Sequence, residues 1–173
     1  MGRWARPLTL LTALALGACG FKPLYGRNDL GSNVGPSLAN VYVEPISDRV
    51  GYELRNDLLD LFNAGGSASD AAYRLKLYLS TNEEAVVLQP NTSITRYNYT
   101  LTAHYDLIRK GETDAAKSGN VTALAAYNVA AAPFLYATVT AQRDAQNRAA
   151  NDIAERIRTQ IAVYLRTANA APR

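Results

Sequence analysis

Apolar and polar residues alternate strictly along two stretches of the chain. The first runs from Ala71 to Ser80, and the second covers residues 95–107, where the odd positions from Tyr97 onward are apolar or aromatic. A period of two is typical of a strand with one face buried and the other in water. The segment "QPNTS" between them has the composition of a turn. The two stretches therefore predict one long hairpin.

The register of this hairpin follows from its parity. If residues 90–92 form the loop, the numbers of facing residues sum to 182, and Lys76 faces Asp106. A slip by one residue would turn Lys76 into the core, which disfavours the neighbouring registers. The stretch from Glu83 to Leu88 interrupts the alternation and predicts a bulge.

Two other stretches have helical spacing. One begins after Ser47 or Asp48, either of which can cap a helix, and ends near Asn63. The other extends from about Thr138 to Thr167. The apolar residues that recur at helical spacing are Val50, Leu54, Leu58, Leu61 and Phe62 in the first, and Val139, Ala145, Ala149, Ile153, Ile157, Ile161, Tyr164 and Leu165 in the second. Each helix presents one apolar face to a core.

Two short strands complete the pattern. "ANVYVEPI" alternates up to Pro45, and residues 119–129 form a strand of small residues that Pro133 ends. The order strand, helix, three strands, helix predicts an α/β (α+β) fold, a two-layer sandwich in which two helices pack on one face of a four-stranded, mostly antiparallel sheet. We expect a single domain over residues 41–168, a tether over residues 19–40 and a disordered tail over residues 169–173.

The first 18 residues have the layout of a secretory signal peptide. Two arginines precede an apolar run from Leu8 to Leu16, which is about half the ~20 residues that span a bilayer. The run ends in Leu16, Gly17, Ala18 and Cys19, which looks like the lipobox of bacterial lipoproteins. In that family the cysteine is lipidated and becomes the first residue of the mature chain. Cys19, the chain's one cysteine, is therefore the predicted lipidation site; a buried or redox-active thiol is the alternative.

Charge and composition exclude some classes of partner. The chain carries a net charge of +3, and loss of the two arginines of the signal peptide leaves +1. Phosphate backbones require a concentrated basic face, and none is evident, so we do not expect nucleic acid to bind. The mature 155 residues suffice for one domain with a sizeable core.

Candidate catalytic groups are scarce. The single histidine, His104, lies among threonines in a predicted strand, where a solvated side chain is the simpler interpretation. No motif has the spacing of a metal site or a phosphate loop. Glu83 and Glu84 are adjacent, so in a regular strand they point to opposite faces. We therefore expect no enzymatic activity, no metal and no cofactor beyond the covalent lipid on Cys19.

The uncovered face of the sheet is the remaining candidate for function. The chain contains 11 tyrosines and 3 phenylalanines. Tyrosine is enriched at interfaces but is also a good strand former, so either interpretation stands. Strand parity puts Arg74, Lys76 and Arg96 on this face as candidate contacts for an anionic ligand, although Asp106 opposite Lys76 favours a structural pair there.

The lipobox running into "CGFKPLY", the hairpin "ITRYNYTLTAHYDL" and the terminal "YATVTAQRDAQNRAANDIAERI" resemble the LptE family, the lipopolysaccharide-assembly lipoproteins of Gram-negative outer membranes, in an alphaproteobacterial form. The resemblance implies two helices on a four-stranded sheet. It also implies a plug inside the LptD β-barrel, in a one-to-one complex that delivers lipopolysaccharide to the cell surface, with the lipid fixing the chain to the periplasmic side of the outer membrane. Arg74, Lys76 and Arg96 are then the candidate lipopolysaccharide contacts.

A second hypothesis does not require the barrel. A monomeric envelope lipoprotein could bind a lipid or a cell-wall fragment through the same uncovered face. That role predicts an apolar pocket between the sheet and the helices.

Overall fold

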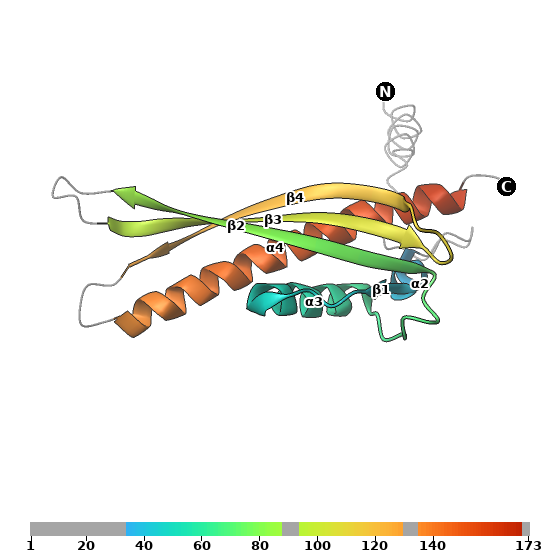
Figure 1. The fold of residues 1–173 in the computed structure, drawn as a ribbon, viewed down its shortest axis with the longest axis horizontal. Helices are drawn as coiled ribbons and strands as arrows, with labels where there is room; N and C mark the ends of the chain where they lie inside the picture. The colour runs from blue at the N-terminus through green and yellow to red at the C-terminus, as the bar shows by residue number, and fades with distance from the viewer. Residues whose placement is uncertain (1–33, 88–93, 130–134, 171–173) are drawn as a thin grey trace, which may run out of the picture.

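The computed structural model describes residues 34–87, 94–129 and 135–170 of the 173-residue chain (Figure 1). The helices are α2 (Val34–Ala39), α3 (Asp48–Phe62) and α4 (Leu135–Ala170). The strands are β1 (Val41–Val43), β2 (Tyr73–Val87), β3 (Ile94–Arg109) and β4 (Ala115–Asn128). The sheet has the order β1-β2-β3-β4, and β1 pairs with β2 in parallel while the other pairs are antiparallel. The predicted α+β sandwich is therefore confirmed.

The predicted register of the hairpin is also confirmed. Facing residues of β2 and β3 sum to 182 from the Tyr73–Arg109 pair through the Val86–Arg96 pair. A register shift follows between Val86 and Val87, inside the segment where a bulge was expected. The loop predicted at residues 90–92 lies outside the described residues.

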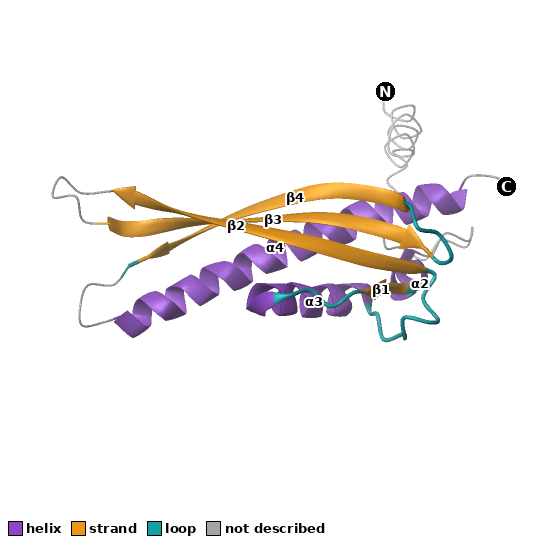
Figure 2. Ribbon diagram, viewed as in Figure 1, coloured by secondary structure: helices purple, strands orange, loops and turns teal. Residues whose placement is uncertain are grey.

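The core lies between one face of the sheet and the long helix α4. Odd-numbered side chains of β3, among them Tyr99, Leu101 and Tyr105, are buried against α4 residues such as Ile153 and Ile157. The helix α3 packs beside α4 and contributes its own apolar stripe to the same cluster. Both helices lie on the same side of the sheet (Figure 2). One predicted core position is wrong, since Val139 is 42% exposed near the start of α4.

Helix α3 begins and ends close to the predicted residues. Ser47 is its N-cap, but the serine side chain makes no capping hydrogen bond. Asn63 ends the helix in the left-handed conformation, with φ of 53°, and its backbone N–H donates to the carbonyl of Asp60. Asparagine tolerates this conformation better than most residues, so the helix ends there rather than at the glycines that follow.

Several boundaries differ from the sequence-based expectation. Helix α2 lies within the segment expected to be a tether, and its Leu38 is 2% exposed in the core cluster. Strand β4 begins at Ala115, four residues before the expected start. Helix α4 extends beyond both predicted ends. The folded part of the chain therefore includes residues ahead of position 41.

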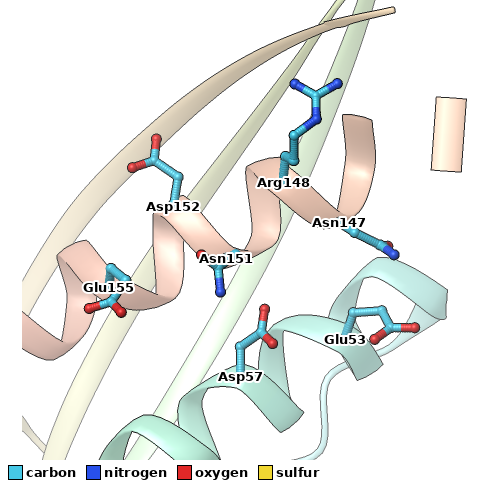
Figure 3. A pocket seen from close by; sticks show the side chains of 7 residues that line it. All are labelled: Glu53, Asp57, Asn147, Arg148, Asn151, Asp152 and Glu155. Carbon is cyan, nitrogen blue, oxygen red and sulfur yellow. The ribbon is translucent and has the colours of Figure 1, made fainter. Parts of the chain in front are cut away.

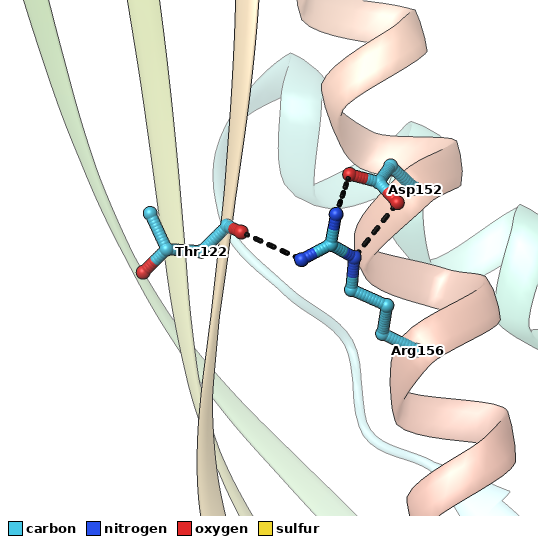
Figure 4. A network of polar contacts seen from close by, with 3 residues as sticks. All are labelled: Thr122, Asp152 and Arg156. Carbon is cyan, nitrogen blue, oxygen red and sulfur yellow. Dashed lines mark hydrogen bonds and ion pairs between the residues drawn. The ribbon is translucent and has the colours of Figure 1, made fainter.

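The outer edge of β4 is covered by arginines from α4. The guanidinium of Arg156 donates to both carboxylate oxygens of Asp152 at 2.8 Å and to the backbone carbonyl of Thr122 at 3.4 Å (Figure 4). Arg148 repeats the arrangement with Asp144 and with the carbonyl of Ala126 at 3.1 Å. Both arginines thus form an i,i+4 ion pair within α4 and also cap a carbonyl at the edge of the sheet.

Candidate functional site

The face of the sheet opposite the helices consists mainly of short polar side chains. These positions are the even-numbered residues of β2, β3 and β4, because the odd-numbered ones point to the helix side, where most of them fill the core. Thr102 and Thr122 face each other across β3 and β4, and their hydroxyl oxygens lie 3.1 Å apart. Leu124 is an apolar exception in this part of the chain and is 67% exposed. The face therefore offers many hydroxyl and amide groups and little apolar area.

His104 lies near one end of this face, with oxygen atoms close to both ring nitrogens. Its Nδ1 is 3.0 Å from Oδ1 of Asn120, and its Nε2 is 3.4 Å from Oδ1 of Asp106. The hydroxyl of Ser118 donates to the same Asp106 oxygen at 2.6 Å. The ring of Tyr78 lies 6.2 Å away, centroid to centroid. His104 is thus half-exposed and held by neighbours, rather than free in solvent.

Arg74 and Lys76 lie close together on this face but in different surroundings. Arg74 makes an ion pair with Glu44 at 3.6 Å, in the loop after β1. Lys76 faces Asp106 as predicted, yet the Asp106 carboxylate is engaged by His104 and Ser118. The expected pair between Lys76 and Asp106 is not among the ion pairs of the described residues. At this end of the face, Lys76 is a cation without a carboxylate partner among the described residues.

Arg96 is far from the other two candidates. It faces Val86, ten residues along β2 from Lys76, which corresponds to about 33 Å at the rise of a β-strand. The three candidate residues occupy the same face of the sheet but do not form one cluster. A single ligand headgroup cannot contact all of them.

A second feature is an acidic groove between α3 and α4, of about 530 Å³ (Figure 3). Glu53 and Asp57 line it from α3, while Asp152 and Glu155 line it from α4. Partial burial raises the pKa of the Asp57 carboxyl, and the nearby Glu53 and Asp60 raise it further. Within the described residues, no group of three or more histidine, cysteine, aspartate or glutamate residues could hold a metal ion.

The sequence pattern did not predict this groove. The carboxylates follow helical spacing within each helix, and that spacing could have placed Glu53 and Asp57 on one face. Their approach to Asp152 and Glu155 depends on how α3 packs against α4, which no local pattern reports.

The predicted lipidation site, Cys19, lies outside the described residues. Among the helices that the structure describes, none is long and apolar enough to cross a membrane.

A comparison with known protein families shows to which family the chain belongs. Residues 38–161, well over half of the chain, match the family LptE, described as Lipopolysaccharide-assembly. The chain belongs to the LptE family. The resemblance drawn from the sequence is therefore confirmed. No curated protein matches the sequence closely enough to count as a relative.

Solved structures share the LptE-type fold seen here. A proposed lipoprotein from Caulobacter crescentus CB15 is 25% identical, with a TM-score of 0.62 over 76% of this chain and 95% of that one. Rare lipoprotein B from Shewanella oneidensis is 16% identical, with a TM-score of 0.52 over 72% of this chain and 92% of its own. At 16% identity the second likeness shows the fold alone.

Proposed function

We propose that the mature chain is an outer-membrane lipoprotein that occupies the lumen of the LptD β-barrel and assists its assembly in lipopolysaccharide transport to the cell surface. A lipid on Cys19 would anchor it on the periplasmic side. The observation that carries the proposal is the LptE family match over residues 38–161. The role requires no catalytic centre and no cofactor.

The surface chemistry of the fold supports a plug. The lumen of a large outer-membrane barrel is polar, so a protein inside it must present polar groups on more than one side. The uncovered sheet face is dominated by hydroxyl and amide side chains, and the helix side carries the carboxylates of the acidic groove. The monomeric-carrier alternative needs a cavity between sheet and helices. The middle of that layer is instead filled by fully buried residues, including Tyr105, Leu101 and Ile157, and the groove of about 450 Å³ at its β2 border is lined by carboxylate and amide groups as well as by apolar ones.

Co-purification tests this role. We expect the affinity-tagged full-length chain, extracted from outer membranes in mild detergent, to bring down one large β-barrel protein in equal amount. Recovery of the tagged chain as a free monomer, with its lipid attached, would contradict the barrel role and favour the monomeric alternative.

Anchoring through Cys19 has its own test. We expect Cys19→Ser to accumulate as an uncleaved precursor, because the lipoprotein peptidase acts only after the sulfur is lipidated. Mass spectrometry of the wild-type mature chain should show Cys19 at the N-terminus with acyl groups attached. An unmodified thiol there would refute the anchor.

We also propose that Arg74 and Lys76, rather than all three candidates together, contact lipopolysaccharide phosphates. Lys76 has no described carboxylate partner, whereas Arg74 would have to share its guanidinium with Glu44. Lys76→Gln should therefore weaken lipopolysaccharide binding to the purified chain more than Arg74→Gln. Arg96→Gln, about 33 Å away, serves as the distant comparison; an equal loss in all three variants would argue for general charge attraction only.

A further inference from the structure

Among the described strands, β2 has an outer edge that is mostly unpaired. β1 has three residues and pairs with β2 only from Tyr73 to Leu75. The last backbone hydrogen bond described along this edge joins the N–H of Glu44 to the carbonyl of Leu75. Pro45 then turns the chain away toward α3. β2 itself continues to Val87, so most of its length has a strand neighbour on one side only.

The bonding groups on this edge can be assigned from strand geometry. In β2 the carbonyl of Leu75 points toward β1, and that of Ala72 bonds to Lys110 at the end of β3. Since backbone groups alternate in direction along a strand, the odd-numbered residues point outward. The N–H and C=O groups of Leu77, Leu79, Thr81 and Glu83 therefore face away from β3. They form a row of donors and acceptors that a further strand can pair with.

A groove accompanies this unpaired edge. It has a volume of about 450 Å³ and is lined from β2 by Leu79, Thr81 and Glu83. The remaining walls come from the start of α3, from β3 and from the first half of α4, and consist of Asp48, Val50, Gly51, Tyr99, Gln142 and Gln146. The groove lies where a longer β1 would have continued. Its floor is partly apolar, as the inner face of an added strand requires.

Tyr99 provides a second, independent observation. The residue is 2% exposed, and its hydroxyl has no hydrogen-bond partner among the described residues. Burial, together with the nearby Glu83 carboxylate, raises the pKa of Tyr99, so the phenol keeps its proton. A buried donor without an acceptor is costly to the folded state, and most buried hydroxyls have a partner. A backbone carbonyl in the groove would supply that acceptor.

The charges around the groove define its occupant. The charged residues that line it are Asp48 and Glu83, and none of the described lining residues is basic. Glu83 accepts hydrogen bonds from Gln142 at 2.9 Å and, more weakly, from Tyr127 at 3.5 Å, and it has no described cation partner. Arg49, on the adjoining turn of α3, is engaged by Asn147, Gln146 and Glu53. A basic side chain is the complement of this site.

We propose that the β2 edge from Leu77 to Glu83 receives an extended segment of a partner polypeptide as an added strand, with a lysine or arginine of that segment placed between Glu83 and Asp48. Backbone hydrogen bonds would supply affinity, and the groove would select the inward side chains. A second copy of the chain is disfavoured as occupant because it brings the same two carboxylates. This inference goes beyond the proposed function, since it requires a strand-forming segment and does not specify a barrel.

Site-specific photo-cross-linking tests the inference. The photoreactive residue p-benzoylphenylalanine replaces Thr81 in the full-length chain expressed in its native envelope, and Thr122 on the capped β4 edge is the matched control position. After irradiation, mass spectrometry identifies the cross-linked peptide. We expect position 81 to cross-link to a segment of another polypeptide that has a lysine or arginine within two residues of the attachment point. Position 122, whose side chain lies on the uncovered face of the sheet, should not cross-link to that segment.

A charge reversal then tests whether the cross-linked segment is held by its basic side chain or only lies nearby. Glu83→Lys should lower the yield at position 81 by about tenfold or more, because it repels the basic side chain. Glu84→Lys, one residue along and on the opposite face, should leave the yield unchanged. Circular dichroism of both variants checks that they fold equally.

The outcomes against the inference are distinct. Cross-links to a second copy, to residues 1–33 of the same chain or to a lipid would overturn it. So would no product at position 81, the same cross-linked peptide at both positions, or equal loss in the two charge variants. The barrel proposal is judged separately by co-purification, so either can fail while the other stands.

Discussion

The two outer edges of the sheet differ in how their backbone groups are satisfied. On the β4 side, α4 runs alongside and its arginines donate to the carbonyls of Thr122 and Ala126. On the β2 side, β1 covers only the first three residues. An unpaired edge invites association with other strands, and natural sheets usually block it. One edge of this sheet is blocked by side chains, while most of the other is left available.

The spacing of two arginines explains how α4 covers the backbone carbonyls of the β4 edge. Arg148 and Arg156 are eight residues apart on a helix, which corresponds to about 12 Å, and their acceptors are four residues apart on a strand, about 13 Å. The two distances match, so arginines about two turns apart on α4 can reach every second outward carbonyl of β4. Asp144 and Asp152, one turn earlier, orient each guanidinium. No equivalent helix accompanies the far part of β2 among the described elements.

Proline substitutions in β2 should have the largest effect on stability, and they should distinguish the paired side of the strand from its outer side. Ser80 faces Thr102 in a hydrogen-bonded pair, so Ser80→Pro removes a bond inside the sheet and should cost about 3 kcal/mol or more of unfolding free energy. Thr81→Pro removes an N–H that points to the unpaired edge and should cost about 1 kcal/mol or less. Urea unfolding of the purified variants measures both. Equal losses would mean that the outward groups are not those of the odd residues.

Gly119→Ala should have the next largest effect, on the β4 side. A β-carbon there would lie 2.7 Å from the Tyr105 ring, and that ring is fixed because its hydroxyl donates to Gln160 of α4 at 2.7 Å. Overpacking of this kind costs about 1–3 kcal/mol. Thermal unfolding should show a clear loss for this variant. Gly65→Ala, where an added β-carbon meets nothing, should be close to neutral.

Removal of an edge cap should have a smaller effect on stability. Arg156→Ala loses an exposed ion pair and a bond to the Thr122 carbonyl, together worth roughly 0.5–1 kcal/mol. Its more specific consequence is self-association through the uncovered β4 edge, which sedimentation velocity would detect. Arg143→Ala on the same helix should leave both stability and oligomeric state unchanged. An Arg156→Ala variant that stays monomeric at high concentration would contradict the capping role.

Asp57→Asn, remote from both edges, should have the smallest effect. Because the folded state raises the pKa of this carboxyl, the folded chain binds its proton more tightly than the unfolded chain does. Stability should therefore fall as pH rises from the ordinary value of 3.8 through the folded pKa. Asp57→Asn should remove that fall and stabilise the chain at pH 7 by less than about 1 kcal/mol. Urea unfolding at several pH values measures this, with the exposed Asp114→Asn as control.

The hairpin could be predicted in detail because one side chain decided its register. Only one parity keeps Lys76 out of the core while Leu75 and Leu77 stay inside, and the structure has that parity. The same parity put Arg74, Lys76 and Arg96 on one face. The register also puts Arg96 opposite Val86, so the roughly 33 Å between Lys76 and Arg96 follows from it, whereas grouping the three residues used the parity alone.

The missed features depend on contacts distant in sequence. Residues 34–39 are rich in small residues and resemble a linker, and Leu38 is recognisable as a core residue only once its neighbours are in place. Val139 has the spacing of the apolar stripe, yet it is exposed near the start of α4. The pairs of Arg148 and Arg156 with aspartates are local and predictable, whereas their carbonyl acceptors on β4 leave no mark on the side-chain pattern.

The parallel pairing of β1 with β2 has a consequence for the order of folding. β2, β3 and β4 follow one another in the chain and can assemble as a meander from nearby residues, but Val41 must find Tyr73 across the whole of α3. Closing that longer loop is slower, so β1 joins late. Until β1 pairs, the meander exposes the whole outer edge of β2. A chaperone that binds exposed strand edges would act in that interval.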